Sequence, residues 1–375
     1  MKNFLFVIAT GLILFSCTNS KSDFVEIDIT SAFEQADDDL FVKDYIDSLK
    51  YVFLETNESA LIGEITKLVA TEEFIIILND NSDQLFVFSI TGKHIKTINA
   101  KGNGPSEYLI ITDFHFDPQE KKIFVLDSGH KRVISYEVFS ANTREYPIPL
   151  RFWKFTRLES NQWAFLAMFP NEQWPDFLFI TDSEFNEECT LTKSFSFDIK
   201  KTWGLKNSEI FSDQGGLVFW NRYGDTLFHF QPKSNSNCLV QTKKEVVSIK
   251  SSPLDRDKKI LEYNSFVEYY LTDNYLIFFA NKKRNPHFIF YNRTTGSSSV
   301  SNLFRTKGMI NNLDNGPNFF PDGMANQNVM YNVIAPDKLI QSINTDKKQY
   351  GTEIMKKMKS VKASDNPIIQ IAYYK

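Results

Sequence analysis

The sequence predicts an all-β protein: a six-bladed β-propeller of four-stranded antiparallel blades, with short helical additions near the N-terminus and before the C-terminal strand. Three observations lead to this prediction. Phe (35) and Tyr (15) are abundant among the 375 residues, and aromatic side chains favour pleated, half-buried strands. Short apolar runs alternate with polar turns along most of the chain. Two such units also repeat at a constant offset of 48 residues, and four strands in about 40–50 residues is the period of a propeller blade.

The repeated units can be followed along the chain. The clearest pair is residues 76–88 and residues 124–136, each an apolar run, a polar turn and a second apolar run. Further strands before and after each unit bring the number to four. Weaker copies continue the pattern at residues 163–181, 217–230, 276–291 and 328–374. Six copies predict six blades, and closing them into a ring leaves only short, protected sheet edges.

Two segments outside the repeats are expected to be helical, and one N-terminal strand is expected to close the ring. Residues 337–362 carry apolar side chains near helical spacing among many Lys, and residues 31–45 fit a short amphipathic helix. A strand at residues 24–29 or at residues 50–54 would complete the last blade, which ends with strand 368–374. The sequence leaves these two alternatives open.

Residues 1–16 have the features of an export signal. Lys2 precedes an apolar run from Phe4 to Phe15, which at about 18 Å as a helix is too short to span a bilayer. The run ends in Leu14-Phe15-Ser16-Cys17, which resembles the bacterial lipobox. This resemblance implies cleavage before Cys17 and lipidation of Cys17. An ordinary secretory signal is the alternative.

The predicted organisation of the chain follows from this signal. Residues 1–16 are the signal peptide, residues 17–23 are the lipidated Cys and a polar tether, and residues 24–375 are one propeller domain. Several acyl chains anchor a protein durably. We therefore expect the protein in the bacterial cell envelope, attached to the outer membrane by its N-terminal lipid and facing the periplasm rather than the cell surface.

Composition bears on the partners and on the redox state. The 42 Lys and Arg against 46 Asp and Glu give a net charge of −4, and the basic clusters are short, so we expect no nucleic-acid partner. Beyond Cys17, only Cys189 and Cys238 remain. We expect two buried free thiols, with a single disulfide as the alternative.

Several short motifs occur in a fixed order along residues 45–375. They are Leu54-Glu55-Thr56, Leu61-Ile62-Gly63, Gly102-Asn103-Gly104-Pro105-Ser106-Glu107-Tyr108, Phe124-Val125-Leu126-Asp127, Tyr223-Gly224-Asp225-Thr226 and Asp365-Asn366-Pro367. Together they resemble the bacterial six-bladed β-propeller lipoprotein family, which is itself similar to NHL-repeat propellers. Ser106, Asn79 and Asn315 depart from the pattern of that family. The resemblance implies an architecture and a location rather than an activity.

The connection between the first two blades contains a tight turn. In a four-stranded blade, the loop between the second and third strands lies on the same face as the crossover to the next blade. The Gly102–Tyr108 crossover therefore shares a face with three loops, at residues 79–84, 127–132 and 221–225. We expect a structural role for the turn residues Gly102, Gly104, Pro105, Glu107 and Tyr108. A positive φ at Gly102 or Gly104 would make the turn, and Glu107 would accept backbone N–H bonds.

Two groups of residues on this face are candidate ligand contacts. Asp127, His130 and Arg132 form the most polar of the loops, and the alternative is that Asp127 caps its own loop and pairs with Arg132. The second group, Trp220, Arg222 and Tyr223, would offer stacking faces and bidentate donors. Trp220 stands at a strand end, so simple packing is its alternative. A small hydroxyl-rich or anionic molecule, a glycan or a protein would suit these side chains.

The sequence gives little support for catalysis. None of the five His stands in a metalloprotease or nucleophile-elbow motif, and no catalytic residue or cofactor is predicted. Asp113 and His115 share one face of an inner strand and are weak candidates for a central metal ion. Possible companions are Asn274, Asn311, Asn312 and Asp314. We expect a lipid-anchored, non-enzymatic binding or scaffold propeller; a metal-centred hydrolase or lyase of the envelope is the alternative.

Overall fold

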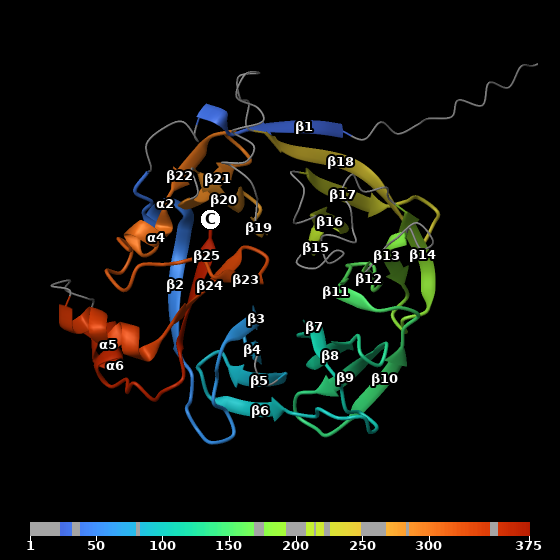
Figure 1. Cartoon of the computed structure of the whole chain (residues 1–375), viewed down its shortest axis with the longest axis horizontal. Helices are drawn as coiled ribbons and strands as arrows, with labels where there is room; N and C mark the ends of the chain where they lie inside the picture. The colour runs from blue at the N-terminus through green and yellow to red at the C-terminus, as the bar shows by residue number, and fades with distance from the viewer. Residues whose placement is uncertain are drawn as a thin grey trace, which may run out of the picture.

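Six sheets arranged as a ring confirm the predicted six-bladed propeller (Figure 1). The computed structural model describes residues 23–31, 38–79, 83–168, 176–192, 208–213, 215–220, 226–248, 268–282, 285–345 and 352–375. The signal peptide, Cys17 and the tether up to residue 22 lie outside the described residues. Among the described residues, no helix is long and apolar enough to cross a bilayer.

Each blade runs from an inner strand near the axis to an outer strand at the rim. Blade 1 contains β3 (Ile65–Ala70), β4 (Phe74–Asn79), β5 (Gln84–Ser89) and β6 (His94–Ile98). Blade 2 contains β7 (Ile111–Asp117), β8 (Lys122–Asp127), β9 (Arg132–Glu137) and β10 (Thr143–Pro147). Blade 3 contains β11 (Phe152–Arg157), β12 (Trp163–Ala167), β13 (Asp176–Thr181) and β14 (Glu187–Thr192).

The second half of the ring repeats this arrangement with two additions from the N-terminus. Blade 4 contains β15 (Glu209–Asp213), β16 (Gly216–Trp220), β17 (Thr226–Pro232) and β18 (Leu239–Ser248), with β1 (Asp23–Asp28) beyond them. Blade 5 contains β19 (Glu268–Leu271), β20 (Tyr275–Lys282), β21 (Asn285–Asn292) and β22 (Ser298–Ser301). Blade 6 contains β23 (Gly323–Asn326), β24 (Val329–Ile334), β25 (Ile368–Tyr374) and, at its rim, β2 (Ile46–Phe53).

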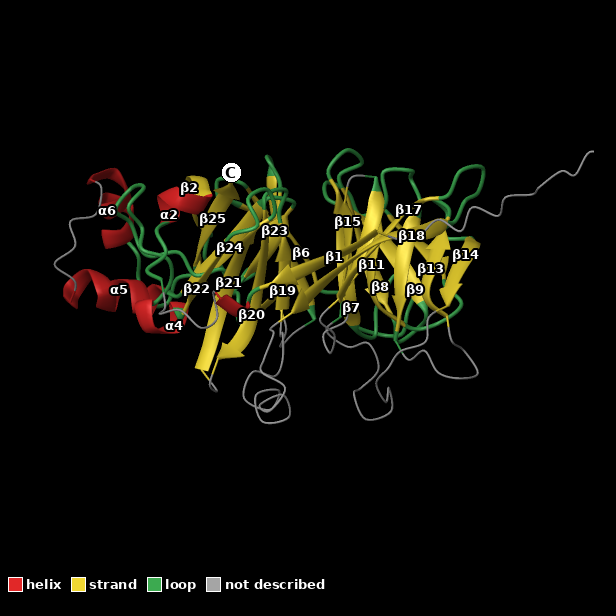
Figure 2. Cartoon of the chain, turned by 90° about the horizontal axis from the view of Figure 1, so that it is seen from above, coloured by secondary structure: helices red, strands yellow, loops and turns green. Residues whose placement is uncertain are grey.

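Strand direction gives the ring two distinct faces. Because neighbouring strands of a blade are antiparallel, the loop between its second and third strands lies on the same side as the crossover to the next blade. We call this side the crossover face. The opposite side carries the other two turns of each blade, and we call it the turn face. Figure 2 shows the ring edge-on, with loops on both faces.

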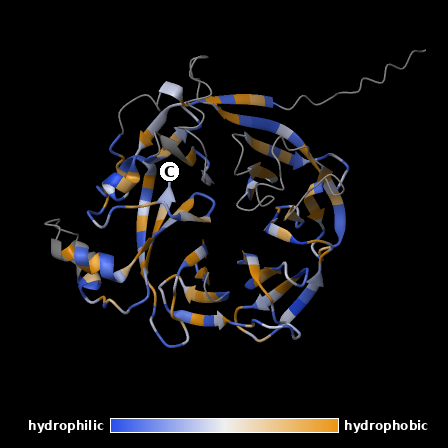
Figure 3. Cartoon of the chain, viewed as in Figure 1, coloured by the Kyte–Doolittle hydropathy of each residue, from blue (hydrophilic) through white to orange (hydrophobic). Residues whose placement is uncertain are grey.

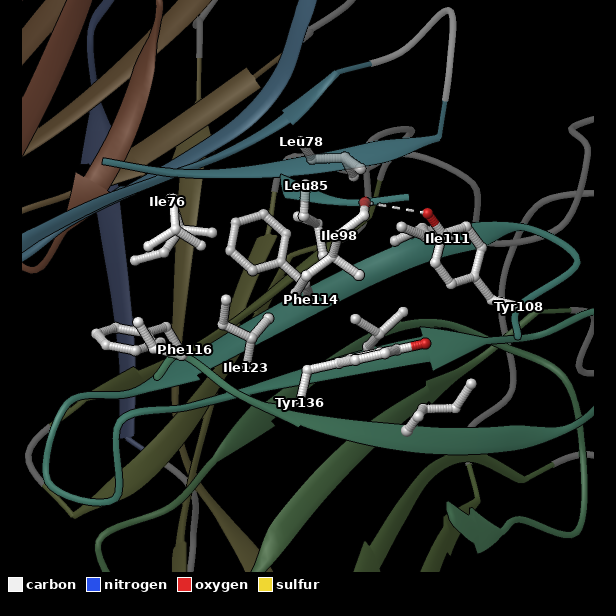
Figure 4. Packing of buried hydrophobic residues seen from close by; sticks show 14 of the residues in the cluster. Ile76, Leu78, Leu85, Ile98, Tyr108, Ile111, Phe114, Phe116, Ile123 and Tyr136 are labelled. Atoms are coloured by element: carbon white, nitrogen blue, oxygen red, sulfur yellow. Dashed lines mark hydrogen bonds between the residues drawn. The ribbon is translucent and has the colours of Figure 1, made fainter. Parts of the chain in front are cut away.

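The core lies between blades rather than inside any one of them. The middle strands β4 and β8 are buried almost throughout, because a sheet covered on both faces needs apolar side chains on both. Figure 4 shows Ile76 and Leu85 of blade 1 packed against Phe114 and Ile123 of blade 2. At the rim, the outer strand β10 is hydrophilic (Figure 3).

The N-terminal segment supplies the strand that closes the ring and a second strand that pairs with blade 4. β2 pairs antiparallel with β25, with Val52 opposite Ile369, so the strand at residues 50–54 is the correct one of the two alternatives. β1 pairs parallel with β18 instead, as a fifth strand of blade 4. The expectation that strand 24–29 could complete the last blade is therefore wrong for that segment. Its apolar side chains Ile27 and Ile29 are buried between blades 4 and 5.

The residues that lie between β1 and β2 in the sequence contact a third blade, blade 5. The N–H of Asp38 donates to the carbonyl of Val300 at the rim of blade 5 (2.8 Å), and the N–H of Val42 donates to the carbonyl of Ile310 (3.0 Å). The described parts of residues 23–53 thus hold the outer parts of blades 4, 5 and 6 in succession. We call these parts the N-terminal strap.

Helices are few, and they lie at one side of the ring (Figure 2). α5 (Pro336–Thr345) and α6 (Thr352–Lys359) are inserted between β24 and β25, as expected for residues 337–362, and they pack through Leu339 and Met358 on Ile368. In the described part of residues 31–45, Ser31 is helical together with Thr30, and the four-residue helix α2 (Val42–Tyr45) lies further on. α4 (Leu303–Thr306) was not expected.

A disulfide joins Cys189 to Cys238, with Cα atoms 5.4 Å apart. The expectation of two free thiols is therefore wrong. Cys189 lies in β14 at the rim of blade 3, and Cys238 directly precedes β18 at the rim of blade 4. The two residues are 49 positions apart, about one blade, so the repeat itself brings them side by side. Nothing in their local sequence reveals this pairing.

Candidate functional site

The crossover from blade 1 to blade 2 is organised by Glu107. Its carboxylate accepts a hydrogen bond from the N–H of Gly104 (2.7 Å), as expected. The positive φ is at Ser106 (φ 60), and neither Gly102 nor Gly104 has one, so the expected reason for these glycines is wrong. Gly102 is needed because a Cβ there would overlap the carboxylate of Glu107. Pro105 lies between them and lacks an N–H to satisfy.

Tyr108 anchors the end of this crossover in the core. Its ring is buried among the apolar side chains of blades 1 and 2, and its hydroxyl lies 3.3 Å from the carbonyl of Ile98 (Figure 4). The same hydroxyl donates to the carbonyl of Asp83 (2.5 Å) in the loop between β4 and β5. Burial raises the pKa of Tyr108 to about 12, so the phenol stays protonated and keeps its role as a donor.

Asp127 is the central carboxylate of the neighbouring loop. It is fully buried, and its Oδ1 accepts from the N–H groups of Leu109 (3.3 Å) and Ile110 (3.5 Å). Its Oδ2 lies 2.6 Å from Nδ1 of His130, whose Nε2 lies 3.1 Å from Oδ1 of Asn103. The carboxylate and imidazole therefore fix the crossover against the loop, and the imidazole remains 27% exposed.

Arg132 completes this network. Its guanidinium contacts Oδ2 of Asp127 (3.4 Å), Oε2 of Glu145 (2.5 Å) and the carbonyl of Glu107. All three nitrogens face protein acceptors, and 16% of the side chain is exposed. The geometry favours a structural role for Asp127 and Arg132, the alternative that the sequence left open. A ligand contact from His130 stays a prediction.

The second predicted cluster is not an exposed stacking surface as far as it is described. Trp220 is 1% exposed at the end of β16, and its ring centroid lies 4.4 Å from that of Tyr269 in blade 5. The expectation that Trp220 offers an aromatic face to a ligand is therefore wrong, because the indole fills the space between blades 4 and 5. Arg222 and Tyr223 lie outside the described residues.

Asp113, on β7, is engaged by neighbouring blades on both sides. Its Oδ1 accepts from Nζ of Lys67 in blade 1 (2.6 Å), and its Oδ2 accepts from the N–H of Phe155 in blade 3 (3.1 Å). His115, on the same strand, packs edge-on against Trp163 at 5.1 Å. Burial lowers the pKa of His115 to about 3, so the imidazole is neutral at physiological pH.

The inner strands of blades 1 to 4 share a charge pattern that the sequence analysis missed. A β-bulge interrupts β3, β7 and β11 at the same point of each strand, and a charged residue follows each one: Lys67, Asp113 and Lys154. Lys154 then pairs with Glu209 of blade 4 (3.0 Å). Burial alone would lower the pKa of Lys154, but Glu209 and Asp113 raise it above its usual value. Charges thus alternate from blade to blade around the axis.

The possible companions of a central metal lie elsewhere. Asn311 and Asp314 lie in the crossover from blade 5 to blade 6, where both form hydrogen bonds with the hydroxyl of Tyr51 on β2. Asn312 accepts from the N–H of Lys43, and Asn274 donates to the carbonyl of Lys375. In the described parts of the chain, no three His, Cys, Asp or Glu side chains gather in a way that could hold a metal. A central metal ion stays an untested prediction.

Exposed apolar side chains on the crossover face were also missed. Leu61 (59% exposed) lies in the crossover from blade 6 to blade 1, and Leu109 and Ile110 (both 45%) lie in the next one. Phe304 (51%), on α4, lies in the crossover that precedes them. The sequence signal was present, because the apolar run at Leu109 begins two residues before β7. Single exposed hydrophobic residues are ordinary, but three consecutive crossovers carry them here.

The comparisons with known proteins agree with this architecture. The model of the family described as domain of unknown function DUF4934 matches residues 24–373, so the chain belongs to that family. A protein from Bacteroides fragilis, provisionally named as an exported protein, shares 14% identity with a TM-score of 0.70, over 94% of this chain and 99% of its own. At that identity the likeness shows a common fold.

Two further solved structures have lower TM-scores. A member of the DUF4221 family from Bacteroides vulgatus shares 12% identity at a TM-score of 0.48, over 88% of this chain and 97% of its own. A protein from Bacteroides uniformis, provisionally named as a 6-phosphogluconolactonase, shares 13% identity at a TM-score of 0.40, over 64% of this chain and 70% of its own. The comparison with curated proteins gives no match.

Proposed function

We propose that this protein is an exported, lipid-anchored and non-enzymatic binding propeller, of NHL-like type, which docks a partner protein on its crossover face. The observation that carries the proposal is the set of exposed aliphatic side chains Leu61, Leu109 and Ile110. Exposed apolar side chains gathered on one face of a domain are characteristic of interaction sites.

The polar network beneath these side chains supports the docking role. The N–H groups of Leu109 and Ile110 both bond to buried Asp127, so the backbone that presents the two side chains is fixed in place. In blade 1 the N–H of Gly63 bonds to Oδ1 of Asn79 in the same way (3.0 Å), which fixes the segment that presents Leu61. A rigid, pre-formed apolar surface loses little conformational entropy on binding.

Export and anchoring rest on the lipobox-like sequence and on the fold relative. The motif ending in Cys17 supports acylation, and the Bacteroides fragilis neighbour that is named as exported supports passage across the inner membrane. A disulfide between Cys189 and Cys238 fits an oxidising compartment. Cys17→Ser should move the protein from the membrane fraction to the soluble fraction or leave it unprocessed. Labelled lipid on that variant would contradict the anchor.

Site-specific photo-crosslinking in living cells tests the docking face. A photoreactive amino acid at Ile110 of the full-length protein should give a discrete adduct of higher mass. The same amino acid at Phe139, which is 66% exposed on the turn face, is the matched control and should give none. The photoreactive amino acid placed instead at Leu61 should also give an adduct. That adduct should disappear when Leu109→Ser and Ile110→Ser are introduced into the same protein. Equal adducts from positions 110 and 139, or none from either, would contradict the proposal.

The metal-centred hydrolase or lyase has weaker geometric support. Both carboxylate oxygens of Asp113 accept hydrogen bonds from protein groups, and Lys67 places a positive charge beside them. Such surroundings favour a structural role for Asp113, linking neighbouring blades, over a role as a ligand of a cation. Elemental analysis of protein purified without chelators tests this alternative, because stoichiometric calcium or zinc would revive it.

A further inference from the structure

We infer that the acylated N-terminus holds the rim of blade 4 against the lipid bilayer, so that the crossover face, with Leu61, Leu109 and Ile110, is presented to the aqueous side. This inference rests on the proposed lipidation of Cys17. It adds which part of the ring touches the membrane and which part stays free for a partner.

The first step is the attachment of the strap. β1 is paired with β18 over six residues, from Asp23 opposite Lys243 to Asp28 opposite Ser248. Its alternate side chains Val25, Ile27 and Ile29 pack into the cluster between blades 4 and 5. Burial of these side chains makes β1 an integral part of the blade, so the tether begins at a fixed point on the rim.

The second step is the reach of the tether. Cys17 and Asp23 are six positions apart, and a fully extended chain spans at most about 3.3–3.6 Å for each residue. The acylated Cys and the start of β1 can therefore be at most about 22 Å apart. So short a chain keeps the start of β1, at the rim of blade 4, close to the bilayer.

The third step is the direction in which the chain enters. β1 is parallel to β18, which starts after the exposed turn at residues 233–237 on the turn face. The chain thus enters β1 from the turn-face side and leaves it at the crossover-face side. The crossover face is therefore the farther one from the anchor. Figure 2 shows β1 crossing the edge of the ring obliquely between the two faces.

The side chains beside the entry point fit a lipid surface. Phe24, the second residue of β1, is 66% exposed and stands opposite Lys244 of β18. An aromatic ring beside a Lys is a combination found at membrane interfaces, where the ring enters the headgroup region and the ammonium stays in water. The occupant of this rim is accordingly a lipid surface.

Fluorescence quenching on vesicles tests the orientation. The acylated full-length protein, reconstituted in phosphatidylethanolamine and phosphatidylglycerol vesicles with a headgroup quencher, would carry one added Cys for labelling. Cys189 and Cys238 are bonded to each other and Cys17 is acylated in this protein, so the added thiol is unique. A label at Glu26→Cys on β1 should be strongly quenched. A label at Glu58→Cys, exposed in the crossover that leads into blade 1 and therefore on the crossover face, should not be.

A longer tether supplies the control. Insertion of 20 Gly and Ser residues between Lys21 and Ser22 should abolish the difference between the two labels while the protein still floats with the vesicles. Equal quenching at positions 26 and 58 in the protein with the native tether would overturn the orientation and leave the anchor standing. Failure of the native protein to float would overturn both the lipid anchor and the orientation.

Discussion

Blade 2 and blade 4 are built to the same plan but held together differently. Blade 2 consists of four strands from one continuous segment, with short turns and a local polar network around Asp127. Blade 4 has a fifth strand from the N-terminus, a disulfide to blade 3 and a buried carboxylate, Glu245, that is 4% exposed. The comparison teaches that a blade can be completed locally or by groups far away in sequence.

The carboxylate of Glu245 illustrates the second kind of support. It lies 3.1 Å from Nε2 of His229 and 3.7 Å from Arg293 of blade 5, and it also contacts Nζ of Lys243. Burial alone would raise the pKa of Glu245, but these positive and hydrogen-bonding partners lower it to about 2. In blade 2, Asp127 is instead satisfied largely by backbone N–H groups and by His130 from its own loop and the adjoining crossover.

The largest expected effect on stability concerns β1, the N-terminal strand that is added to blade 4. Replacing Ile27 and Ile29 with Ala should destabilise the protein by about 4–10 kcal/mol, since truncating each buried Ile to Ala costs about 2–5 kcal/mol. This is comparable with the whole margin of about 5–15 kcal/mol for a typical domain. Chemical denaturation measures it. Phe24→Ala, on the same strand but exposed, is the control and should change stability by less than about 0.5 kcal/mol.

An Ile27→Ala/Ile29→Ala protein as stable as the native one would show that β1 is an accessory to blade 4. Within the N-terminal strap, only the pairing of β2 with β25 would then contribute to stability.

The disulfide should have the next largest effect. Cys189→Ser/Cys238→Ser should lower the free energy of unfolding by about 2–4 kcal/mol, because the cross-link closes a long loop in the unfolded chain. Thermal unfolding with and without reductant measures this. Reductant should lower the melting temperature of the native protein and leave that of the double variant unchanged. An equal response of both proteins would mean that the bond contributes nothing between blades 3 and 4.

Glu245 should make the stability of the protein sensitive to acid through blade 4. A carboxyl group whose pKa is lowered by folding stabilises the folded state at any pH above its pKa in the unfolded chain, which is about 4.3. This stabilisation is lost as the pH falls towards the folded-state pKa of about 2. Glu245→Gln should be less stable at pH 7 by an amount on the order of 3 kcal/mol, and its stability should fall less between pH 4.5 and pH 2. Parallel stability curves for the two proteins would contradict the ion cluster.

The comparison also explains what the sequence could predict. Blade 2 was read correctly from its repeat, because strand periodicity and turn residues are local signals. The strap, the disulfide and the charges of Lys67, Asp113 and Lys154 depend on which blades become neighbours, and no local pattern contains that information. Trp220 was misread for the same reason, since its burial depends on Tyr269 of the next blade. The sequence offered the pairing of Asp127 with Arg132 as the alternative to a ligand contact, because both residues lie within one loop.

The smallest expected effect lies in the crossover of blade 2, at Ser106. This residue adopts a left-handed conformation (φ 60), which costs a non-glycine residue roughly 1–2 kcal/mol. Ser106 recovers part of that cost, because its hydroxyl lies 2.6 Å from that of Thr143 and its N–H donates to Glu145 (2.6 Å). Ser106→Gly keeps the N–H, removes the strain and loses the hydroxyl contact, so stability should change by less than about 1 kcal/mol. Thr143→Val removes the same contact and keeps the strain, so it should be destabilising by about 0.5–1.5 kcal/mol. If Ser106→Gly proves the more destabilising of the two in denaturant titrations, the left-handed conformation at Ser106 costs the fold no strain that a glycine would relieve.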